Sequence, residues 1–224
     1  SRLTERLTGR SLAVRIGLSG ALSVAVAVTV VAALDHQAAR RELISHHKDQ
    51  LQTAVRLGAH AIDVPLHEAV RVSGDAGSPE FLTLREQLRT VQSDASLTSP
   101  VYTLQRDGAG TRFVGMTNEA PFVGDPYELR PGVAATFDGG GVGDEGPYHD
   151  AHGQWISAWA PLLDDQGHIV GVLQADHDVA AAMMTLWNRT LLRLLFALGG
   201  AAGAFALAAT LARRPGYIRR ESVG

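Results

Sequence analysis

Polar and aromatic side chains gather just before an apolar run in the second half of the chain, and their types could bind a small molecule or a metal ion. Tyr148, His149, Asp150 and His152 stand within five positions of one another. Imidazole and carboxylate groups are ligands for divalent cations, so His149, Asp150 and His152 are weak candidates for a metal site. Equally, Tyr148 and His152 could belong to a polar loop that covers a ligand pocket, or the whole segment could be a solvated loop without a role.

The apolar run that follows, QWISAWAPLL, predicts a β-strand whose side chains alternate between two faces. Trp155, Ser157 and Trp159 should share one face, which then carries two indoles around a hydroxyl group. Such a face is typical of an amphipathic pocket wall, so these three residues are candidate ligand contacts. The alternative is that both indoles are buried in the core or at its rim. The intervening residues are small and aliphatic, and they suit packing against a helix.

A second charged group follows the next predicted strand. Asp176 and Asp178 flank His177 there. Either carboxylate suits the N-cap of the following helix, and together they should favour the protonated form of His177. Asp176 is also a candidate ligand contact. Nine histidines in the chain leave a pH sensor open as an alternative.

Arg130 lies in a segment rich in proline, glycine and acidic residues, YELRPG. A guanidinium group can bind a carboxylate with two parallel hydrogen bonds, so Arg130 is the candidate contact for an anionic ligand. The alternative is a surface ion pair with Asp125 or Glu128, which would contribute little to stability.

Two long apolar runs must position these groups relative to a membrane. Residues 16–34 and 194–212 are stretches of nineteen residues without a charge, each long enough to cross the bilayer core as a helix. We expect membrane-spanning helices at residues 16–34 and 190–212. A cleaved signal peptide is the alternative for the first run, but its apolar stretch is longer than the core of a typical signal peptide.

Arginines flank both runs on their outer sides in the sequence: Arg2, Arg6, Arg10, Arg15, Arg213, Arg214, Arg219 and Arg220. Because positive charge gathers on the cytoplasmic side of spanning helices, residues 1–15 and 213–224 are predicted to be cytoplasmic, and residues 35–187 to lie outside the cytoplasm. The chain starts without Met and stops twelve residues after the second run. We therefore expect a fragment whose cytoplasmic output domain follows it.

The composition of residues 35–187 restricts the function further. This segment contains 10 Lys and Arg against 21 Asp and Glu, a net charge of −11, which argues against nucleic-acid binding. The chain has no cysteine, so disulfides and thiolate chemistry are excluded. Walker, GxSxG, HExxH and CxxC motifs are also missing from the sequence. We expect neither an enzyme nor a cofactor site in this segment.

The pattern of the outer segment predicts an α+β domain. The first membrane helix should continue outward as far as Pro65, and a second helix should run from Ser78–Pro79 to about Ser96. Four strands are expected at residues 99–105, 111–117, 154–163 and 168–176, joined by short turns. Residues 118–132 should form a loop, and residues 133–146 one helical turn followed by a flexible glycine stretch.

The long first helix carries an apolar seam with the spacing of a helix-packing face, at Leu43, His47, Leu51, Ala54, Gly58 and Ala61. A second copy of the chain could pack against this seam in a homodimer. The seam could equally pack against the chain's own sheet, because both arrangements need the same periodicity.

The sequence from Tyr148 to Asp178 resembles the C-terminal half of extracytoplasmic PAS-like sensors, the Cache or PDC domains. The shared pattern falls on these residues: Gly153, Trp155, Ser157, Pro161, Leu162, Asp164, Gly167, Gly171, Val172, Leu173 and Asp176. The stretches VYTLQRDG, which contains Tyr102, and FVGMTNEAPFVGDPYELRP resemble the family's first hairpin and its ligand-side loop. The chain departs from amino-acid-binding members because their Arg-and-Asp motif is not found in register, and it has one PAS-like unit.

The resemblance implies a fold and a role. It implies a PAS-like antiparallel sheet with a long N-terminal helix, flanked by two membrane helices, in a two-pass protein of the bacterial inner membrane with its sensor domain in the periplasm. The implied function is a ligand-sensing input module for a histidine kinase, a nucleotide or diguanylate cyclase or a chemoreceptor. A small molecule such as an organic acid or amino acid is the expected partner, and Tyr102 joins the candidate contacts. Alternatives are a ligand-free dimerisation module and a divalent-cation or pH sensor.

Overall fold

The computed structural model describes the backbone of residues 2–213 and the side chains of residues 17–207, 209 and 210. The chain divides into two compact units, one made of residues 1–40 and 184–224 and the other of residues 41–183. The arginine side chains before residue 16 and after residue 212, and the predicted cytoplasmic linker from residue 214 onward, lie outside what is described.

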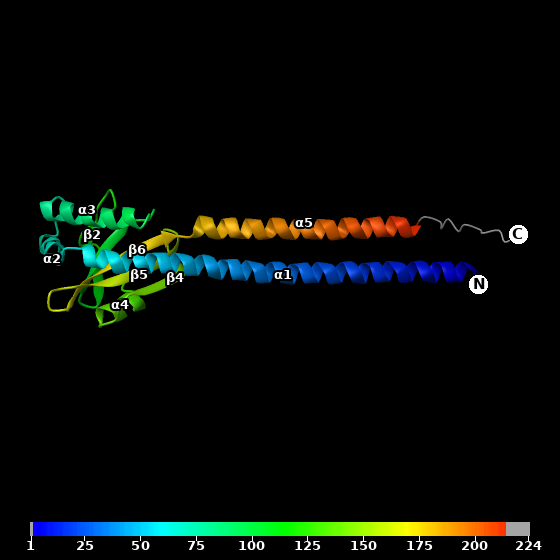
Figure 1. Ribbon diagram of the computed structural model, residues 1–224, viewed down its shortest axis with the longest axis horizontal. Helices are drawn as coiled ribbons and strands as arrows, with labels where there is room; N and C mark the ends of the chain where they lie inside the picture. Colours follow the sequence, from blue (N-terminus) through cyan, green and yellow to red (C-terminus); the bar gives the residue numbers. More distant parts are fainter. Residues whose placement is uncertain (1, 214–224) are drawn as a thin grey trace. The chain divides into compact units, whose positions relative to one another are not determined.

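The first unit consists of parts of two long helices, α1 (Arg2–Ala61) and α5 (Ala180–Arg213) (Figure 1). Both helices contain segments that are long and apolar enough to cross a membrane, within Gly17–Ala61 and Ala180–Leu207. Large apolar side chains in these segments are exposed, among them Leu22 at 65% and Phe196 at 79%. Within this unit Nδ1 of His36 lies 2.9 Å from the Thr190 hydroxyl oxygen, and the His36 ring meets Trp187 edge-on.

Two shorter helices of the second unit begin at side-chain caps that the sequence encodes. Helix α2 (Val64–Ser73) follows Asp63, whose Oδ1 accepts a hydrogen bond from the amide of Leu66. Pro65 therefore stands in the first turn of a new helix, and α1 ends before it at Ala61. Helix α3 (Pro79–Asp94) begins in the same way, because the Ser78 hydroxyl accepts from the amide of Phe81 at 3.1 Å.

The sheet of the second unit has six antiparallel strands in the order β3-β2-β1-β6-β5-β4. Their bounds are Val101–Asp107 for β1, Gly110–Met116 for β2, Pro126–Tyr127 for β3, Gly143–His149 for β4, Gln154–Leu163 for β5 and Ile169–Asp178 for β6. This antiparallel sheet, with the long N-terminal helix, confirms the predicted α+β fold class.

One face of the sheet is covered by α1, α2 and α3. A Cβ on Gly58 of α1 would lie 2.9 Å from Leu173 on β6, and a Cβ on Gly171 of β6 would lie 2.8 Å from the His67 ring of α2. A Cβ on Gly115 of β2 would lie 2.6 Å from Leu84 of α3. On β5 the neighbours that share this face are Ile156, Ala158, Ala160 and Leu162, all buried. The prediction that the small aliphatic face packs against helices is confirmed.

The other face carries α4 (Pro131–Phe137) and the polar side chains of β6. Trp155, Ser157 and Trp159 lie opposite Asp178, Asp176 and Gln174 in the β5–β6 ladder, so all six residues share this face.

Two strands were missed by the sequence reading. The segment Gly143–His149 was expected to be a glycine stretch and a polar loop, but it forms edge strand β4. Its glycines, proline and carboxylates have low β-propensity, and its pairing with β5 is what holds it extended. The two-residue strand β3 lies inside the expected loop for the same reason, because it pairs with Thr111 and Arg112 of β2.

The apolar seam of α1 packs largely on the chain's own domain. Leu51, Ala54 and Gly58 are buried, and Gly58 lies against Val91 of α3 as well as against the sheet. Ala61 is exposed. The central residues of the seam therefore pack on the chain's own core, as one of the two interpretations predicted.

Candidate functional site

A cavity of about 360 Å³ opens on the sheet face opposite helices α1 to α3. Its walls come from all six strands and the segments beside them, and its apolar lining is mainly aromatic. The lining residues are Ser99, Pro100, Tyr102, Phe113, Asn118, Phe122, Tyr127, Tyr148, Asp150, His152, Trp155 and Asp176. A cavity of this size, with aromatic walls and few polar groups, is typical of a site for a small organic molecule.

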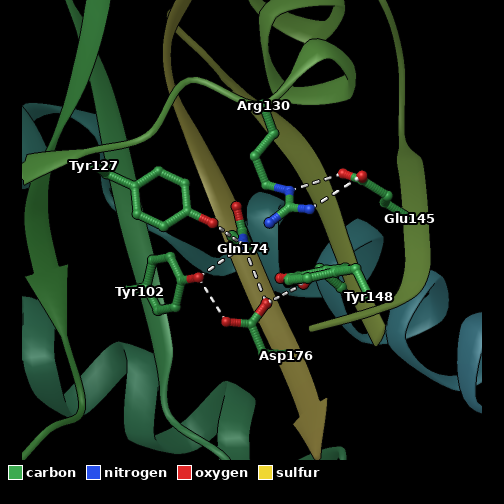
Figure 2. A network of polar contacts seen from close by, with 8 residues as sticks. Tyr102, Tyr127, Arg130, Glu145, Tyr148, Gln174 and Asp176 are labelled. Carbon is green, nitrogen blue, oxygen red and sulfur yellow. Dashed lines mark hydrogen bonds and ion pairs between the residues drawn. The ribbon is translucent and has the colours of Figure 1, made fainter. Parts of the chain in front are cut away.

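Asp176 is the centre of a polar network at the wall of this cavity (Figure 2). The Tyr102 hydroxyl donates to one of its carboxylate oxygens at 2.6 Å, and the Ser157 hydroxyl donates to the other at 2.6 Å. The amide nitrogen of Gln174 also lies 3.0 Å from Asp176, 2.7 Å from the Tyr102 hydroxyl and 2.9 Å from the Tyr127 hydroxyl. Three side chains, from β1, β5 and β6, thus converge on one carboxylate, and Tyr127 of β3 joins the network through Gln174.

Burial decides the protonation chemistry of this network. Burial raises the pKa of Asp176, although hydrogen bonds from Ser157, Tyr102 and Gln174 oppose that rise. Burial, followed by the charge of Asp176, also raises the pKa of Tyr102, which keeps its hydroxyl a donor. Gln174 is fully buried, and its side-chain oxygen has no hydrogen-bond partner among the described residues.

Arg130 belongs to a neighbouring ion pair and does not line the cavity. Its guanidinium donates two hydrogen bonds to the carboxylate of Glu145, at 2.9 and 3.1 Å, and lies 3.5 Å above the centre of the Tyr148 ring (Figure 2). The hydrogen bonds to Glu145 raise the pKa of Arg130. Its ion-pair partner is therefore Glu145 of β4, and neither Asp125 nor Glu128 forms an ion pair with it in the part of the chain that the structure describes.

Tyr148 links the ion pair to the network. Its hydroxyl oxygen lies 2.7 Å from the Ser157 hydroxyl, which in turn donates to Asp176. Burial is the main cause of the raised pKa of Tyr148. The candidates Tyr102, Tyr148, Ser157 and Asp176 are thus brought together, although Ser157 is fully buried behind Tyr148 and Asp176.

The metal candidates His149, Asp150 and His152 do not form a cluster that could coordinate a metal ion. Asp150 Oδ1 accepts hydrogen bonds from the amides of His152 and Gly153 and from the indole nitrogen of Trp155 at 2.9 Å. Although slight burial opposes it, these hydrogen bonds lower the pKa of Asp150. Across the described part of the chain, no group of three His, Cys, Asp or Glu side chains is placed to hold a metal ion. Asp150 instead fixes the Trp155 ring at the cavity wall.

Trp159 differs from Trp155 in what covers it. Trp159 is 2% exposed, lies beneath α4 and does not line the cavity. A Cβ at Gly132 would lie 2.2 Å from its Cζ2 atom, and one at Gly143 would lie 2.7 Å from its Nε1 atom. Strand alternation put both indoles on one face, but only the tertiary structure shows that α4 encloses one of them.

Several residues of the site were missed by sequence reasoning. Tyr127, Gln174, Glu145, Asn118, Phe113 and Phe122 lie in the network, the ion pair or the cavity wall. One usable signal was present, because Gln174 interrupts the apolar strand VGVLQAD on the same face as Asp176. Asn118 and Phe122 lie in an irregular segment, where no periodicity indicates the direction of a side chain.

The expectation for His177 was wrong. Its ring does not sit between two carboxylates but stacks on His47 of α1. Burial is the main cause of its lowered pKa, and only Asp178 opposes the shift. Asp178 has the predicted capping role, since its Oδ1 accepts from the amide of Ala180 at the start of α5.

No protein-family model matches the sequence, and no curated protein matches it. Among solved structures, the sensor domain of the V. cholerae histidine kinase DctB aligns at 15% identity and a TM-score of 0.43, covering 66% of this chain and 60% of that one. The E. coli DcuS sensor domain aligns at 13% identity and 0.46, covering 65% and 97%. The ligand-binding domain of the Pseudomonas aeruginosa PAO1 amino acid chemoreceptor PctC, in complex with GABA, aligns at 16% and 0.36, covering 65% and 64%.

These similar structures are sensor and ligand-binding domains, the class that the residues from Tyr148 to Asp178 resemble. The chain spans less than two thirds of the DctB and PctC domains. Because each TM-score is below 0.5, the likeness alone assigns neither a family nor a ligand to this chain.

Proposed function

We propose that residues 35–187 form the extracytoplasmic ligand-sensing input domain of a membrane receptor, held by membrane helices at residues 16–34 and 190–212. The observation that carries the proposal is the 360 Å³ cavity with the Asp176 network in its wall. Buried polar groups cost free energy unless they are hydrogen-bonded, and a hydrogen-bonded network beside an open aromatic cavity is suited to orienting a ligand.

The position of Asp176 suggests how binding would reach the membrane helices. Asp176 faces the cavity, the next residue His177 contacts α1, and Asp178 caps the first turn of α5. A ligand that moves the end of β6 would therefore act on both helices through adjacent residues. Strand β4 offers a second connection, because Glu145 faces Arg130 while its neighbour Asp144 pairs with Lys48 of α1 at 2.5 Å.

The receptor type is proposed from the resemblance of residues 148–178 to Cache sensors. It would be a two-pass receptor of a bacterial inner membrane, with residues 35–187 in the periplasm and residues 1–15 and 213–224 in the cytoplasm. Its output would be that of a histidine kinase in a two-component system, a nucleotide or diguanylate cyclase, or a chemoreceptor.

The ligand-sensing role can be tested on the 224-residue chain in lipid nanodiscs. Because the chain has no cysteine, Met184→Cys gives a single labelling site at an exposed position of α5. Small organic acids, amino acids and amines would be screened by thermal shift, and each stabilising compound tested for a change in the spectrum of the label. We expect at least one compound to do both. If no compound stabilises the chain, or if stabilisation leaves the label unchanged, the proposal fails.

Asp176→Asn provides the site-directed version of this test, and Asp165→Asn is its matched control. Asp165 is exposed at the β5–β6 turn, so its substitution removes the same charge far from the cavity along the hairpin. Stabilisation by the ligand should be lost in the first variant and kept in the second.

A second role, association of two copies, is favoured by one feature of α1. A groove of about 540 Å³ between α1 and α3 has small and apolar residues in its lining, among them Ala54, Gly58 and Val91, beside polar ones such as Asp49. Leu57 in this groove is 66% exposed. An exposed apolar groove on a helix suits a helix from a second copy. Leu57→Glu should then shift the chain from dimer to monomer in light scattering of detergent-solubilised protein. A monomeric starting protein would contradict this role.

A further inference from the structure

The charges at the cavity point to the class of ligand, an inference that rests on the proposed sensing function. Among the described residues that line the cavity, Asp150 and Asp176 are acidic, and none is Lys or Arg. The guanidinium of Arg130 nearby is already bound by Glu145 through two hydrogen bonds and covered by the Tyr148 ring. Apart from the exposed imidazole of His152, an anionic ligand would therefore meet carboxylates without a free cation to compensate them.

The aromatic walls add attraction for positive charge. Six rings line the cavity, those of Tyr102, Phe113, Phe122, Tyr127, Tyr148 and Trp155. Phe113 meets Tyr102, Phe122 and Tyr127 edge-to-face, with ring centroids 4.7 to 5.1 Å apart. Rings that stand at steep angles to one another present several negative faces to a common space, and these faces attract an ammonium group.

The acceptors at the wall complete the pattern. Asn118 lines the cavity, and its side-chain oxygen is buried without a hydrogen-bond partner. Asp176 is oriented by donors from the protein on both of its oxygens, Tyr102 on one and Ser157 on the other. The wall thus has an unsatisfied acceptor and a fixed carboxylate, which complement a ligand that donates N–H groups.

We propose that the cavity binds a small organic ammonium ion, an amine whose N–H groups donate to Asp176 and Asn118 while its hydrocarbon part lies against the aromatic rings. The expectation of an organic acid bound through Arg130 is replaced by this one. Amino acids are disfavoured as well, since their carboxylate would lack a partner in the cavity lining.

Matched sets of probes separate charge from shape. The 224-residue chain in nanodiscs would be titrated calorimetrically with benzylamine, benzyl alcohol and benzoate, and with isopentylamine, isopentyl alcohol and isovalerate. Empty nanodiscs correct for partition into lipid. We expect at least one amine to bind, and to bind about tenfold or more tightly than its alcohol and its acid, because charge-assisted hydrogen bonds distinguish them.

Two variants locate the effect. Asp176→Asn should weaken amine binding by about tenfold or more, whereas Asp165→Asn should leave it unchanged. Tighter binding of benzoate or isovalerate than of the amines overturns the ammonium proposal and leaves the sensing function standing. Equal amine binding by both variants overturns it as well. If neither amines nor any other probe binds or stabilises the chain, the sensing function fails together with it.

Discussion

His177 of β6 stacks on His47 of α1, with ring centroids 4.1 Å apart and ring planes inclined by 23°. The contact joins the strand that carries Asp176 to the long N-terminal helix. Burial lowers the pKa of both rings, and the charge of His177 lowers that of His47 further. Both shifts favour the neutral form of the stacked rings.

A double-mutant cycle of His47→Ala and His177→Ala should show coupling at pH 8. Stacked rings contribute about 0.5–1.5 kcal/mol beyond their burial, so we expect a coupling free energy of that order in thermal unfolding. At pH 5 the two imidazoles bind protons more readily in the unfolded chain than in the native stack, because both native pKa values are lowered. The coupling free energy should therefore shrink or change sign at that pH. Equal coupling at both pH values would show that the rings are not the titrating contact.

His67 should make the domain sensitive to mild acid. It is fully buried, neither ring nitrogen has a hydrogen-bond partner, and burial lowers its pKa to about 4. The unfolded chain takes up this proton at about pH 6.5, so the unfolded state binds more protons between these values. Stability should therefore be fully present above pH 6.5 and fall as the pH drops toward 4, by at most about 3 kcal/mol.

His67→Leu tests this directly, with the exposed His60→Leu as its control. Melting temperatures between pH 4 and 8 should flatten in the first variant and keep their slope in the second. An unchanged slope in His67→Leu would assign the acid sensitivity to other groups.

The two indoles of β5 should respond differently to truncation. Trp159→Ala empties a space enclosed by α4 and should cost about 3–5 kcal/mol of unfolding free energy. Trp155 lines the cavity and is partly exposed, so Trp155→Ala should cost less stability and weaken ligand binding more. Thermal unfolding and calorimetric titration of the same two variants would measure both effects. If Trp155→Ala leaves binding intact, Trp155 is not a ligand contact.

Asp176→Asn should raise the melting temperature of the ligand-free chain. Burial raises the pKa of Asp176, which means that its ionised form is unfavourable in the native state, and the cost grows as the pH rises through the native pKa. The amide removes this cost: its oxygen still accepts from one of the two hydroxyls of Tyr102 and Ser157, and its NH2 group can donate to the other. A stabilised variant that no longer binds ligand would identify Asp176 as a residue kept for function, whereas a destabilised one would identify it as structural.

The sequence predicted the elements in which local signals and the final fold agree. Strand β5 matches the apolar alternation of Gln154–Leu163, and α3 begins at the Ser78 cap as expected. Strand β4 could not be found in this way, because its order comes from pairing with β5 and its own residues favour a loop. A strand at a sheet edge can be specified by its neighbour.

The candidate site was likewise predicted only where its residues lie on strands that the sequence reveals. Tyr102, Tyr148, Ser157 and Asp176 do converge, because strand register places them on one face. The partner of Arg130 was not predicted, since Glu145 lies on the strand that the sequence did not reveal. The ion-pair partner of Arg130 depends on the pairing of β4 with β5, which only the tertiary structure establishes.

The glycines that enclose Trp159 restrict how this domain can change over evolutionary time. Any side chain at Gly132 or Gly143 would occupy space that the indole now fills. A larger residue at either position is compatible with folding only if a smaller residue replaces Trp159. Substitutions at Gly132 or Gly143 should therefore occur together with a smaller residue at position 159. Related sequences should vary the cavity wall around Trp155 far more freely than the residues packed beneath α4.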